Sequence, residues 1–328
     1  MDGKAILVTG SCGFIGSHMC ELLVREGYRV IGFDRYNSEN HWGWLEESEC
    51  RSDMEIVLGD IRDYDSVSKM IKRSSAVIHM AALIGIPYSY VSPLAYLRTN
   101  VEGTYNVLES SRVYDLDQVV LISTSETYGS AQYIPIDEAH PSVGQSPYAA
   151  SKIAADQLGI SYHKSFDLPV RIARPFNTYG PRQSARGVIP SIISQVLLGK
   201  VDIQLGNTTP TRDFTYVADT CSAILAVYGS SELTGDVINI GSGAEISIEN
   251  LAKTIGELME VDINIVDQDM RKRPDASEVS RLFCDNRKLL QHTQWSPHYD
   301  LKTGLIETIR WHRKLDLAKL EKQYNYNI

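Results

Sequence analysis

The 328-residue chain lacks any apolar run long enough to cross a membrane, and basic residues are in the minority. Its 32 Lys and Arg against 41 Asp and Glu give a formal net charge of -9. A general nucleic-acid binder needs a basic face, and a membrane span needs about 20 consecutive apolar residues, so we expect neither partner. An anionic small molecule stays possible, because a few well-placed arginines focus a local positive field.

Cysteine is also scarce. The five cysteines are odd in number, scattered and without CxxC spacing: Cys12, Cys20, Cys50, Cys221 and Cys284. This pattern favours free structural thiols in a reducing compartment. No His/Cys cluster has metal-ligand spacing, so we expect no metal. The first residues lead directly into a predicted strand, so we expect no signal peptide and a cytoplasmic protein.

Short runs rich in Val, Ile and Leu alternate with helical segments in the first half of the chain. The predicted strands span 4–10, 28–34, 54–60, 76–82, 118–124 and 169–175, and a helix is expected over about 14–26. Near-continuous apolar runs are typical of strands buried on both faces, and their alternation with helices implies βαβ crossovers. We therefore predict an α/β fold with a doubly wound parallel (Rossmann) sheet over residues 1–175.

After Pro175 the pattern loosens. Residues 173–190 are rich in Pro, Gly, Arg and Asn, which predicts a loop that lines a cleft. Later segments read as helices at 191–200 and 246–260, strands at 201–206 and 236–242, and a strand turning into a helix over 213–229. We expect residues 176–328 to form mainly a smaller, interleaved C-terminal substrate-binding lobe, with segments near 212–241 returning to the first domain.

A glycine-rich turn, TGSCGFIGS, follows the first predicted strand and opens the first helix. Gly10, Gly13 and Gly16 allow a tight turn, close approach to a pyrophosphate and close packing of the helix on the sheet. Asp34 ends the next strand about twenty positions on, where a carboxylate accepts hydrogen bonds from ribose hydroxyls and repels a 2′-phosphate. We therefore expect NAD rather than NADP, although the adjacent Arg35 offers a partner for that phosphate.

Three other features in the first eighty residues have more than one interpretation. Asp60, at the end of a strand, either contacts the adenine pocket or caps a helix. Trp42 and Trp44 either cover the cofactor or pack against the fold. His79, at another strand end, is expected to be a hydrogen-bonded core residue rather than a catalytic group.

Tyr148 and Lys152 are spaced i, i+4 and so share one face of a helix, with Pro147 suited to its first turn. A phenol with a pKa near 10 is a poor base at neutral pH. A nearby ammonium and a positive nicotinamide ring would lower that pKa, so Tyr148 could take a proton from a hydroxyl while hydride moves to the cofactor. The alternative is a chance pair on an amphipathic helix.

Several strings together carry a family resemblance: TGSCGFIGS, HMAAL, TNVEGTYNVL, STSETYG, YAASK, RPFNTYGP, TRDFTYVADT and INIGS. Over nearly its whole length the chain resembles extended short-chain dehydrogenases/reductases that act on nucleotide sugars. The resemblance implies that Thr124 hydrogen-bonds the reacting hydroxyl, that Tyr148 is the base and that Lys152 holds the nicotinamide ribose. Asn100 would bend a helix near the site. The other cofactor contacts that we expect are Phe14, Ile15, Ile61 and Ala81.

Ser125 and Glu126 point to a subfamily, because sugar 4,6-dehydratases carry Thr followed by Asp-Glu or Ser-Glu. After oxidation at the 4-position, Glu126 would remove the acidified proton from the 5-carbon, the 6-hydroxyl would leave as water, and hydride would return to the 6-carbon. Whether Ser125 or Glu126 protonates the leaving hydroxyl stays open. The plain alternative is a surface glutamate at a strand end.

The substrate candidates are mostly cationic. Arg212 and Arg273 match positions where the family binds the diphosphate, and the planar arginine fork suits paired phosphate oxygens. Asn177 matches a substrate-contacting asparagine. Arg182 and Val188 are further candidates.

At finer grain the chain resembles retaining UDP-N-acetylglucosamine 4,6-dehydratases of legionaminic acid and related surface-sugar pathways, through ALIGIPYSYVSP, GSAQYIPIDEAHP and GQSPYAASKIAADQL. The alternatives are a UDP-glucuronate decarboxylase, a 4-epimerase and a catalytically silent NAD-binding scaffold. Helices near 100–113 and 148–165 form a dimer interface in the family, so we expect a homodimer, although packing within the monomer explains the same apolar faces.

Overall fold

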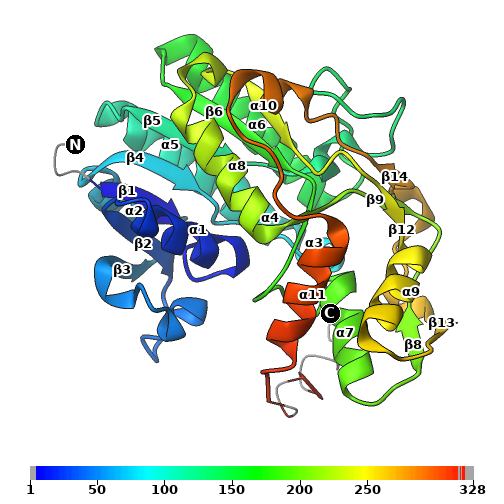
Figure 1. The fold of residues 1–328 in the computed structure, drawn as a ribbon. Coiled ribbons are helices and arrows are strands. Elements are labelled where there is room, and N and C mark those ends of the chain that lie inside the picture. The colour runs from blue at the N-terminus through cyan, green and yellow to red at the C-terminus, as the bar shows by residue number, and fades with distance from the viewer. Residues whose placement is uncertain (1–4, 317, 319, 322–328) are drawn as a thin grey trace.

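The structure is a computed structural model that describes residues 5–316, 318, 320 and 321. The described residues form a seven-stranded parallel sheet in the order β11-β6-β5-β4-β1-β2-β3 (Figure 1). Its strands are β1 (Ala5–Thr9), β2 (Val30–Arg35), β3 (Met54–Gly59), β4 (Ser74–His79), β5 (Gln118–Ile122), β6 (Val170–Pro175) and β11 (Val237–Ile240). The strand order reverses between β1 and β4, as in a doubly wound sheet, so the predicted fold class is confirmed.

Helices cover both faces of this sheet. They are α1 (Phe14–Arg25), α2 (Tyr64–Ile71), α5 (Gly103–Val113), α6 (Pro147–Phe166) and α8 (Val217–Gly229). Alternate residues of β1 enter different cores: Ile6 and Val8 pack with α1 and α8, whereas Ala5 and Leu7 pack with α2, α5 and α6. This two-sided burial explains why the strand is apolar throughout rather than alternating.

Between β4 and α5 the chain forms α3 (Ile86–Val91), α4 (Pro93–Tyr96) and a π-helical segment (Leu97–Glu102). Short 3-10 turns elsewhere span Gly43–Glu47, Arg51–Asp53, Ser125–Tyr128, Ser231–Leu233, Asp269–Arg271 and Asp275–Ser277. Among the described residues no helix is both long and apolar enough to cross a bilayer.

A second group of elements lies beside the sheet, at the right of Figure 1. Its helices are α7 (Val188–Leu197), α9 (Ile248–Met259) and α11 (Leu301–His312), and α10 (Arg287–His292) lies against β11. Its short strands are β7 (Asn177–Tyr179) with β10 (Phe214–Tyr216), β8 (Asp202–Leu205) with β13 (Asn264–Asp267), and β12 (Ile246–Ser247), β9 (Thr211–Arg212) and β14 (Arg281–Leu282) as one sheet. Between these segments the chain returns to the large sheet, where β11 pairs with β6.

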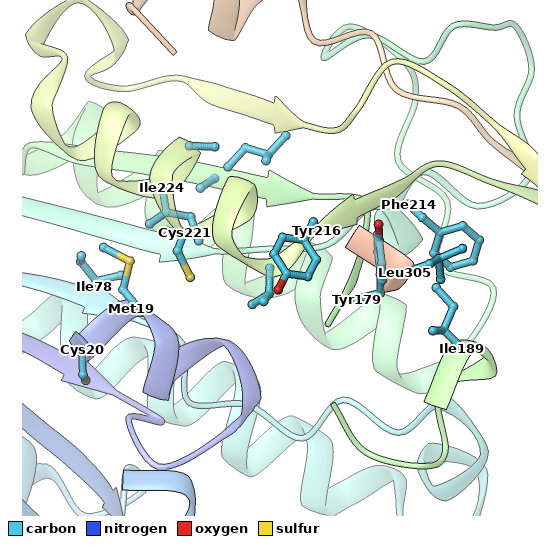
Figure 2. Packing of buried hydrophobic residues seen from close by; sticks show 14 of the residues in the cluster. Met19, Cys20, Ile78, Tyr179, Ile189, Phe214, Tyr216, Cys221, Ile224 and Leu305 are labelled. Atoms are coloured by element: carbon cyan, nitrogen blue, oxygen red, sulfur yellow. The ribbon is translucent and has the colours of Figure 1, made fainter. Parts of the chain in front are cut away.

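One apolar core joins the two parts (Figure 2). Near the large sheet it contains Met19 of α1 and Cys221 of α8, and it continues to Tyr179, Phe214 and Leu305 on the other side. Burying each such side chain contributes about 1.5–3 kcal/mol, so the two parts cannot separate without exposing much of this surface. All five cysteines are free thiols, as predicted.

Candidate active site

The glycine-rich turn forms a cradle that has no room for a side chain at Gly10 or Gly16. Gly10 has φ +71°, and a Cβ there would lie 2.9 Å from the backbone nitrogen of Ala81. A Cβ on Gly16 would lie 2.0 Å from the carbonyl oxygen of Gly10. Gly13 precedes α1 and provides no side-chain cap, so the first N–H groups of α1, beginning at Phe14 and Ile15, stay open to a phosphate.

Asp34 lies at the end of β2 beside this turn. Its Oδ2 accepts a hydrogen bond from the backbone N–H of Cys12 at 2.7 Å, and Oδ1 accepts one from the N–H of Arg35 at 2.8 Å. A carboxylate has about four acceptor sites, so capacity remains for ribose hydroxyls. The cradle and this carboxylate fit a dinucleotide whose ribose carries free hydroxyls.

The structure decides part of the open interpretation of Asp60. Asp63, not Asp60, caps α2, where it accepts a hydrogen bond from the backbone N–H two residues on. Asp60 instead pairs with Arg62, with 2.5 Å between Oδ2 and Nη2, and this guanidinium lowers the pKa of Asp60. Ile61 is buried directly after it. Asp60 and Ile61 stay candidates for the adenine end of the cofactor.

The two tryptophans after β2 pack against the fold. The ring of Trp44 lies 5.4 Å from that of Trp311 on α11, and its backbone N–H donates to the carbonyl of Cys12 at 3.2 Å. The guanidinium of Arg51 lies 4.6 Å from the Trp42 ring centroid. The packing interpretation therefore accounts for both, and Trp44 also supports the glycine-rich turn.

The N-terminus of α6 positions the predicted catalytic pair. Ser146 caps the helix by accepting a hydrogen bond from the N–H of Ala149 at 3.0 Å, and Pro147 is the first helical residue, as predicted. Tyr148 and Lys152 follow on the buried face of the helix. The site thus rests on the N-terminal half of a 20-residue helix that is held at its cap.

Tyr148 meets Thr124 at the point where β5 ends. Burial raises the pKa of the Tyr148 phenol, and a hydrogen bond from Thr124 opposes that rise. The Thr124 hydroxyl also accepts a hydrogen bond from the backbone N–H of Glu126 at 3.3 Å. The ring of Tyr96 packs edge-on against Tyr148 at 6.2 Å. The two hydroxyl groups that a reacting alcohol would contact are therefore together.

The ammonium group of Lys152 lies at the same strand end. It is buried and donates to the carbonyl of Ile122, the last residue of β5, at 2.6 Å. Burial lowers the pKa of Lys152, and the carboxylate of Asp156 opposes this. The sequence predicted an ammonium close to the phenol; the structure shows the ammonium bound to a backbone acceptor, because a buried cation needs a hydrogen-bond partner.

Asn100 lies in the π-helical segment, which agrees with the helix-bending role implied by the resemblance. Its Oδ1 accepts from the backbone N–H of Leu83 at 2.8 Å, and its Nδ2 donates to the Leu83 carbonyl and, at 2.9 Å, to the hydroxyl of Ser151. Ser151 lies between Tyr148 and Lys152 in the sequence. Asn100 therefore ties the catalytic helix to the chain that follows β4.

His79 is a hydrogen-bonded core residue, as predicted. Its Nδ1 lies 2.7 Å from the Thr9 hydroxyl and its Nε2 lies 3.1 Å from the Thr104 hydroxyl. Burial lowers the pKa of His79 to about 3, so the ring is neutral at physiological pH.

Glu126 is not a solvated surface residue. Its side chain is 12% exposed, and its carboxylate accepts from Nη1 of Arg273 at 3.4 Å. Arg212 lies nearby, and the charges of Glu126 and Arg273 both act on its pKa, which burial lowers. Arg212 pairs with Glu278 at 3.3 Å. Ser125 is buried in the same turn.

A cavity of about 770 Å³ opens beside Arg273. Its lining is mostly polar and comprises Gly206, Asn207, Thr208, Glu249, Ile265, Asp267, Lys272, Arg273, Glu278 and Ser280. The cavity is of a size that suits a small-molecule ligand. Of its lining residues, Arg273 also contacts the carboxylate of Glu126.

The remaining substrate candidates differ in whether the structure leaves them available to a ligand. The Oδ1 atom of Asn177 is buried with no hydrogen-bond partner in the described chain, which leaves an acceptor for a ligand. Val188 is the first residue of α7. Arg182 is not brought together with the other arginines: its guanidinium pairs with Glu21 at 2.8 Å and with the Ser17 hydroxyl at 3.1 Å, both on α1.

Comparison with known proteins decides the family. The sequence profile of the GDP-mannose 4,6-dehydratase family matches residues 7–308. The chain belongs to this family. It is therefore an enzyme of the nucleotide-sugar dehydratase and epimerase group, and its cofactor is NAD.

Relatives in this group have different activities. A putative UDP-glucose 4-epimerase of Methanocaldococcus jannaschii is 34% identical, over 93% of this chain and 97% of that one. The UDP-N-acetyl-alpha-D-glucosaminuronate decarboxylase of Bacillus cytotoxicus is 32% identical, over 95% and 99%. The crystal structure of the dTDP-glucose 4,6-dehydratase DesIV of Streptomyces venezuelae with NAD and TYD bound matches with a TM-score of 0.86 and 28% identity, over 94% and 97%.

Sequence reasoning missed one contact and some residues of this dehydratase-family site. Glu126 and Arg273 were both candidates, but their contact joins residues 147 positions apart, so no local pattern predicts it. Tyr96 packs on Tyr148 from α4, which also lacks a motif. Asp156 had a signal, because it follows Lys152 by four residues on the same helix face. Among the described residues, no cluster of three metal-binding side chains is present.

Proposed function

We propose that the chain is a 4,6-dehydratase that converts UDP-N-acetylglucosamine to its 4-keto-6-deoxy derivative. The observation that carries this is the position of Glu126. A largely buried carboxylate whose charge acts on Tyr148 is of no use for a simple oxidation or for epimerisation at the 4-position. It is what removal of a proton from the 5-carbon requires.

In the oxidation step, NAD supplies the hydride acceptor. Thr124 hydrogen-bonds the 4-hydroxyl of the sugar, and Tyr148 takes its proton. The ammonium of Lys152, fixed at the end of β5, stabilises the phenolate form of Tyr148 and holds the nicotinamide ribose. The product of this step is a 4-keto sugar.

In the elimination step, the ketone acidifies the hydrogen on the 5-carbon, and Glu126 removes it. The 6-hydroxyl leaves as water after receiving a proton, and Glu126 is then the proton carrier in reach, with Ser125 positioning the leaving group. Hydride returned to the 6-carbon and a proton added to the 5-carbon complete the reaction. Protons balance, because the two taken from the 4-hydroxyl and the 5-carbon equal the one that leaves in water and the one that enters the product. Electrons balance, because the hydride taken from the 4-carbon ends on the 6-carbon.

The second group of elements supplies the rest of the substrate site in this proposal. Arg212 and Arg273 bind the diphosphate, and Asn177 offers its unpartnered amide oxygen to the sugar. The cavity beside Arg273 then takes the nucleoside. Support for a uracil base and an acetamido sugar comes from relatives: two carry UDP-sugars in their descriptions, and one of these sugars is N-acetylated.

One observation favours a second candidate, a decarboxylase of a UDP-hexuronate. Arg273 lies against Glu126, where a guanidinium would also hold a carboxylate on the 5-carbon of such a substrate. The B. cytotoxicus relative, at 32% identity, has this type of activity in its name. Both candidates share the same 4-keto intermediate.

Mass spectrometry of reactions with the purified protein and NAD separates these functions. The substrates are UDP-N-acetylglucosamine, its GDP counterpart, dTDP-glucose and UDP-glucuronate. Loss of one water from UDP-N-acetylglucosamine, faster than from the others, is the expected result. Loss of carbon dioxide from UDP-glucuronate instead assigns the decarboxylase, and no change of mass in any sample contradicts both.

A homodimer is part of the proposal. Leu94, Leu97 and Tyr105 lie on α4, the π-helical segment and α5, and each is more than 40% exposed. An apolar face of this kind is unfavourable in water unless it is covered. Light scattering on the purified protein is expected to give twice the mass of the 36.7-kDa chain.

A further inference from the structure

A buried charged cluster lies behind the catalytic helix, and none of its members has a direct role in the hydride transfer or the water loss proposed above. Asp156 of α6 pairs with Arg174 of β6 at 2.7 Å, and the two side chains are 4% and 5% exposed. The hydroxyl of Ser123 donates to the same oxygen of Asp156 at 2.7 Å. The Arg174 guanidinium also lies 4.5 Å from the ring centroid of Tyr128. We call Ser123, Asp156 and Arg174 the Asp156 cluster.

The Asp156 cluster joins the elements that carry the catalytic groups. Ser123 is the residue directly before Thr124, and it follows Ile122, whose carbonyl binds the Lys152 ammonium. Asp156 is one helical turn beyond Lys152 on α6. A single carboxylate therefore fixes the end of β5 against the helix that carries Tyr148 and Lys152.

Stability alone does not explain this arrangement. Burying an ion pair costs a desolvation penalty that its attraction often fails to recover, and apolar side chains of the same volume are frequently as stable or more so. The nearby Lys152 gives the negative charge a use. A fully buried ammonium tends to lose its proton, and at low dielectric a carboxylate one turn away opposes that loss strongly.

We propose that Asp156 is a positioning residue for the hydride-transfer step: its buried carboxylate holds the Thr124 strand end against α6 and keeps Lys152 charged. This rests on the proposed role of Tyr148 and Lys152 in oxidation. It does not depend on which reaction follows, because dehydratase, decarboxylase and epimerase chemistry share that step.

The charges around Lys152 and Tyr148 determine in which direction the loss of Asp156 shifts their pKa values. The titratable and charged groups that act on Lys152 or Tyr148 are His79 on β4, Tyr96 on α4, Glu126 on the turn after β5 and Asp156 on α6. Arg174 on β6 pairs with Asp156, and Tyr128 lies against Arg174. His79 is neutral, and the charge of Asp156 raises the pKa of both Lys152 and Tyr148. Removing that charge lowers both pKa values, so the pH range of activity moves to lower pH.

The test compares Asp156→Asn with Ser123→Ala. Asparagine keeps the shape and can still accept from Ser123, so it removes mainly charge. The alanine variant removes one hydrogen bond and keeps the charge. With the substrate found by mass spectrometry, we expect both limbs of the kcat/KM pH profile to move down by about 1 unit or more in Asp156→Asn, and neither to move in Ser123→Ala. Equal movement in both variants, or in neither, overturns the charge role.

A direct titration separates this inference from the proposed function. Protein labelled with ε-¹³C lysine gives one NMR signal for Lys152, identified by its loss in Lys152→Met. The pH at the midpoint of that signal's titration is expected to fall in Asp156→Asn, whether or not any sugar nucleotide is turned over. An unchanged midpoint overturns the inference even if the enzyme dehydrates its substrate.

A third variant applies if Asp156→Asn does not fold. Asp156→Leu combined with Arg174→Met replaces the whole buried pair by apolar side chains, a change that is often tolerated. The Lys152 midpoint is then expected to fall, as in the first variant, because the charge of Asp156 is what raises it. A rise or no change contradicts the proposal.

Discussion

The two walls of the active site are built differently. On the oxidation side, Thr124, Tyr148 and Lys152 lie at the end of a central strand and on a capped 20-residue helix. On the arginine side, Arg212 lies on a two-residue strand and Arg273 on a segment between 3-10 turns. Behind the oxidation side, the nitrogen–oxygen distance in the buried pair of Arg174 and Asp156 is 2.7 Å. On the arginine side, the corresponding distances are 3.3 Å for Arg212–Glu278 and 3.4 Å for Arg273–Glu126.

This difference separates common chemistry from specific chemistry. Hydride transfer needs exact geometry, and regular elements whose side chains are locked by packing provide it. Substrate choice varies among relatives that are about one third identical to this chain, and irregular segments tolerate such variation. The oxidation side should therefore respond to mutation through the rate, and the arginine side mainly through substrate binding.

Tyr148→Phe tests the oxidation side and should have the largest effect. The ring still packs against Tyr96, but the proton acceptor is lost, so turnover should fall by about 10²–10⁴-fold or more. The thermal midpoint should stay close to that of the wild type, which differential scanning fluorimetry checks. Product measured by mass spectrometry at near wild-type rates would show that Tyr148 is not the base.

Glu126→Gln tests whether the carboxylate belongs to a second chemical step. Hydride transfer should survive, while water loss should fall by about 10²–10⁴-fold, because an amide cannot accept the proton. Absorbance at 340 nm should then rise on substrate addition and persist, rather than decay as in the wild type.

The matched control for this change is Glu278→Gln. It neutralises another carboxylate of the site, one that pairs with Arg212 and lines the cavity and that the proposal gives no proton to carry. At saturating substrate its absorbance at 340 nm should therefore decay as in the wild type. If Glu126→Gln retains full dehydration, the dehydratase assignment is wrong.

The sequence predicted the oxidation side well. The strand run 118–124 and the Tyr148/Lys152 spacing are local patterns, and both lie where the structure has β5 and the start of α6. The glycine cradle is equally local, because steric crowding at Gly10 and Gly16 acts between neighbouring backbone segments.

The arginine side could not be predicted in the same way. The sequence makes Arg182 a further substrate candidate, beside Arg212 and Arg273. Its actual partner, Glu21, is 161 residues away, and its backbone has φ +70°, neither of which a local pattern reveals. The partners of a long flexible side chain are set by tertiary packing, so residue type alone does not identify them.

Arg273→Gln tests the arginine side. If the guanidinium binds the diphosphate, losing its charge-assisted hydrogen bonds should raise KM by about 10–100-fold, with a smaller change in kcat. Arg281→Gln is the matched control, because this arginine pairs with Glu245 and does not line the cavity, and KM should change less than about two-fold. A fall in kcat alone for Arg273→Gln would place its role with Glu126 rather than with substrate binding.

Asp34→Asn and Asp34→Ala should have the smallest effects, and they separate charge from support of the glycine-rich turn. Asparagine can still accept the N–H of Cys12, so it removes mainly the repulsion of a 2′-phosphate. It should weaken NAD binding by up to about ten-fold while NADP binding improves or stays constant. Alanine also leaves the Cys12 N–H without its acceptor, which should weaken the binding of both cofactors, and NAD should still lose more affinity than NADP. Calorimetric titration of each variant with each cofactor gives the four affinities, and equal losses for NAD and NADP in the asparagine variant would contradict the role of the Asp34 charge in cofactor choice.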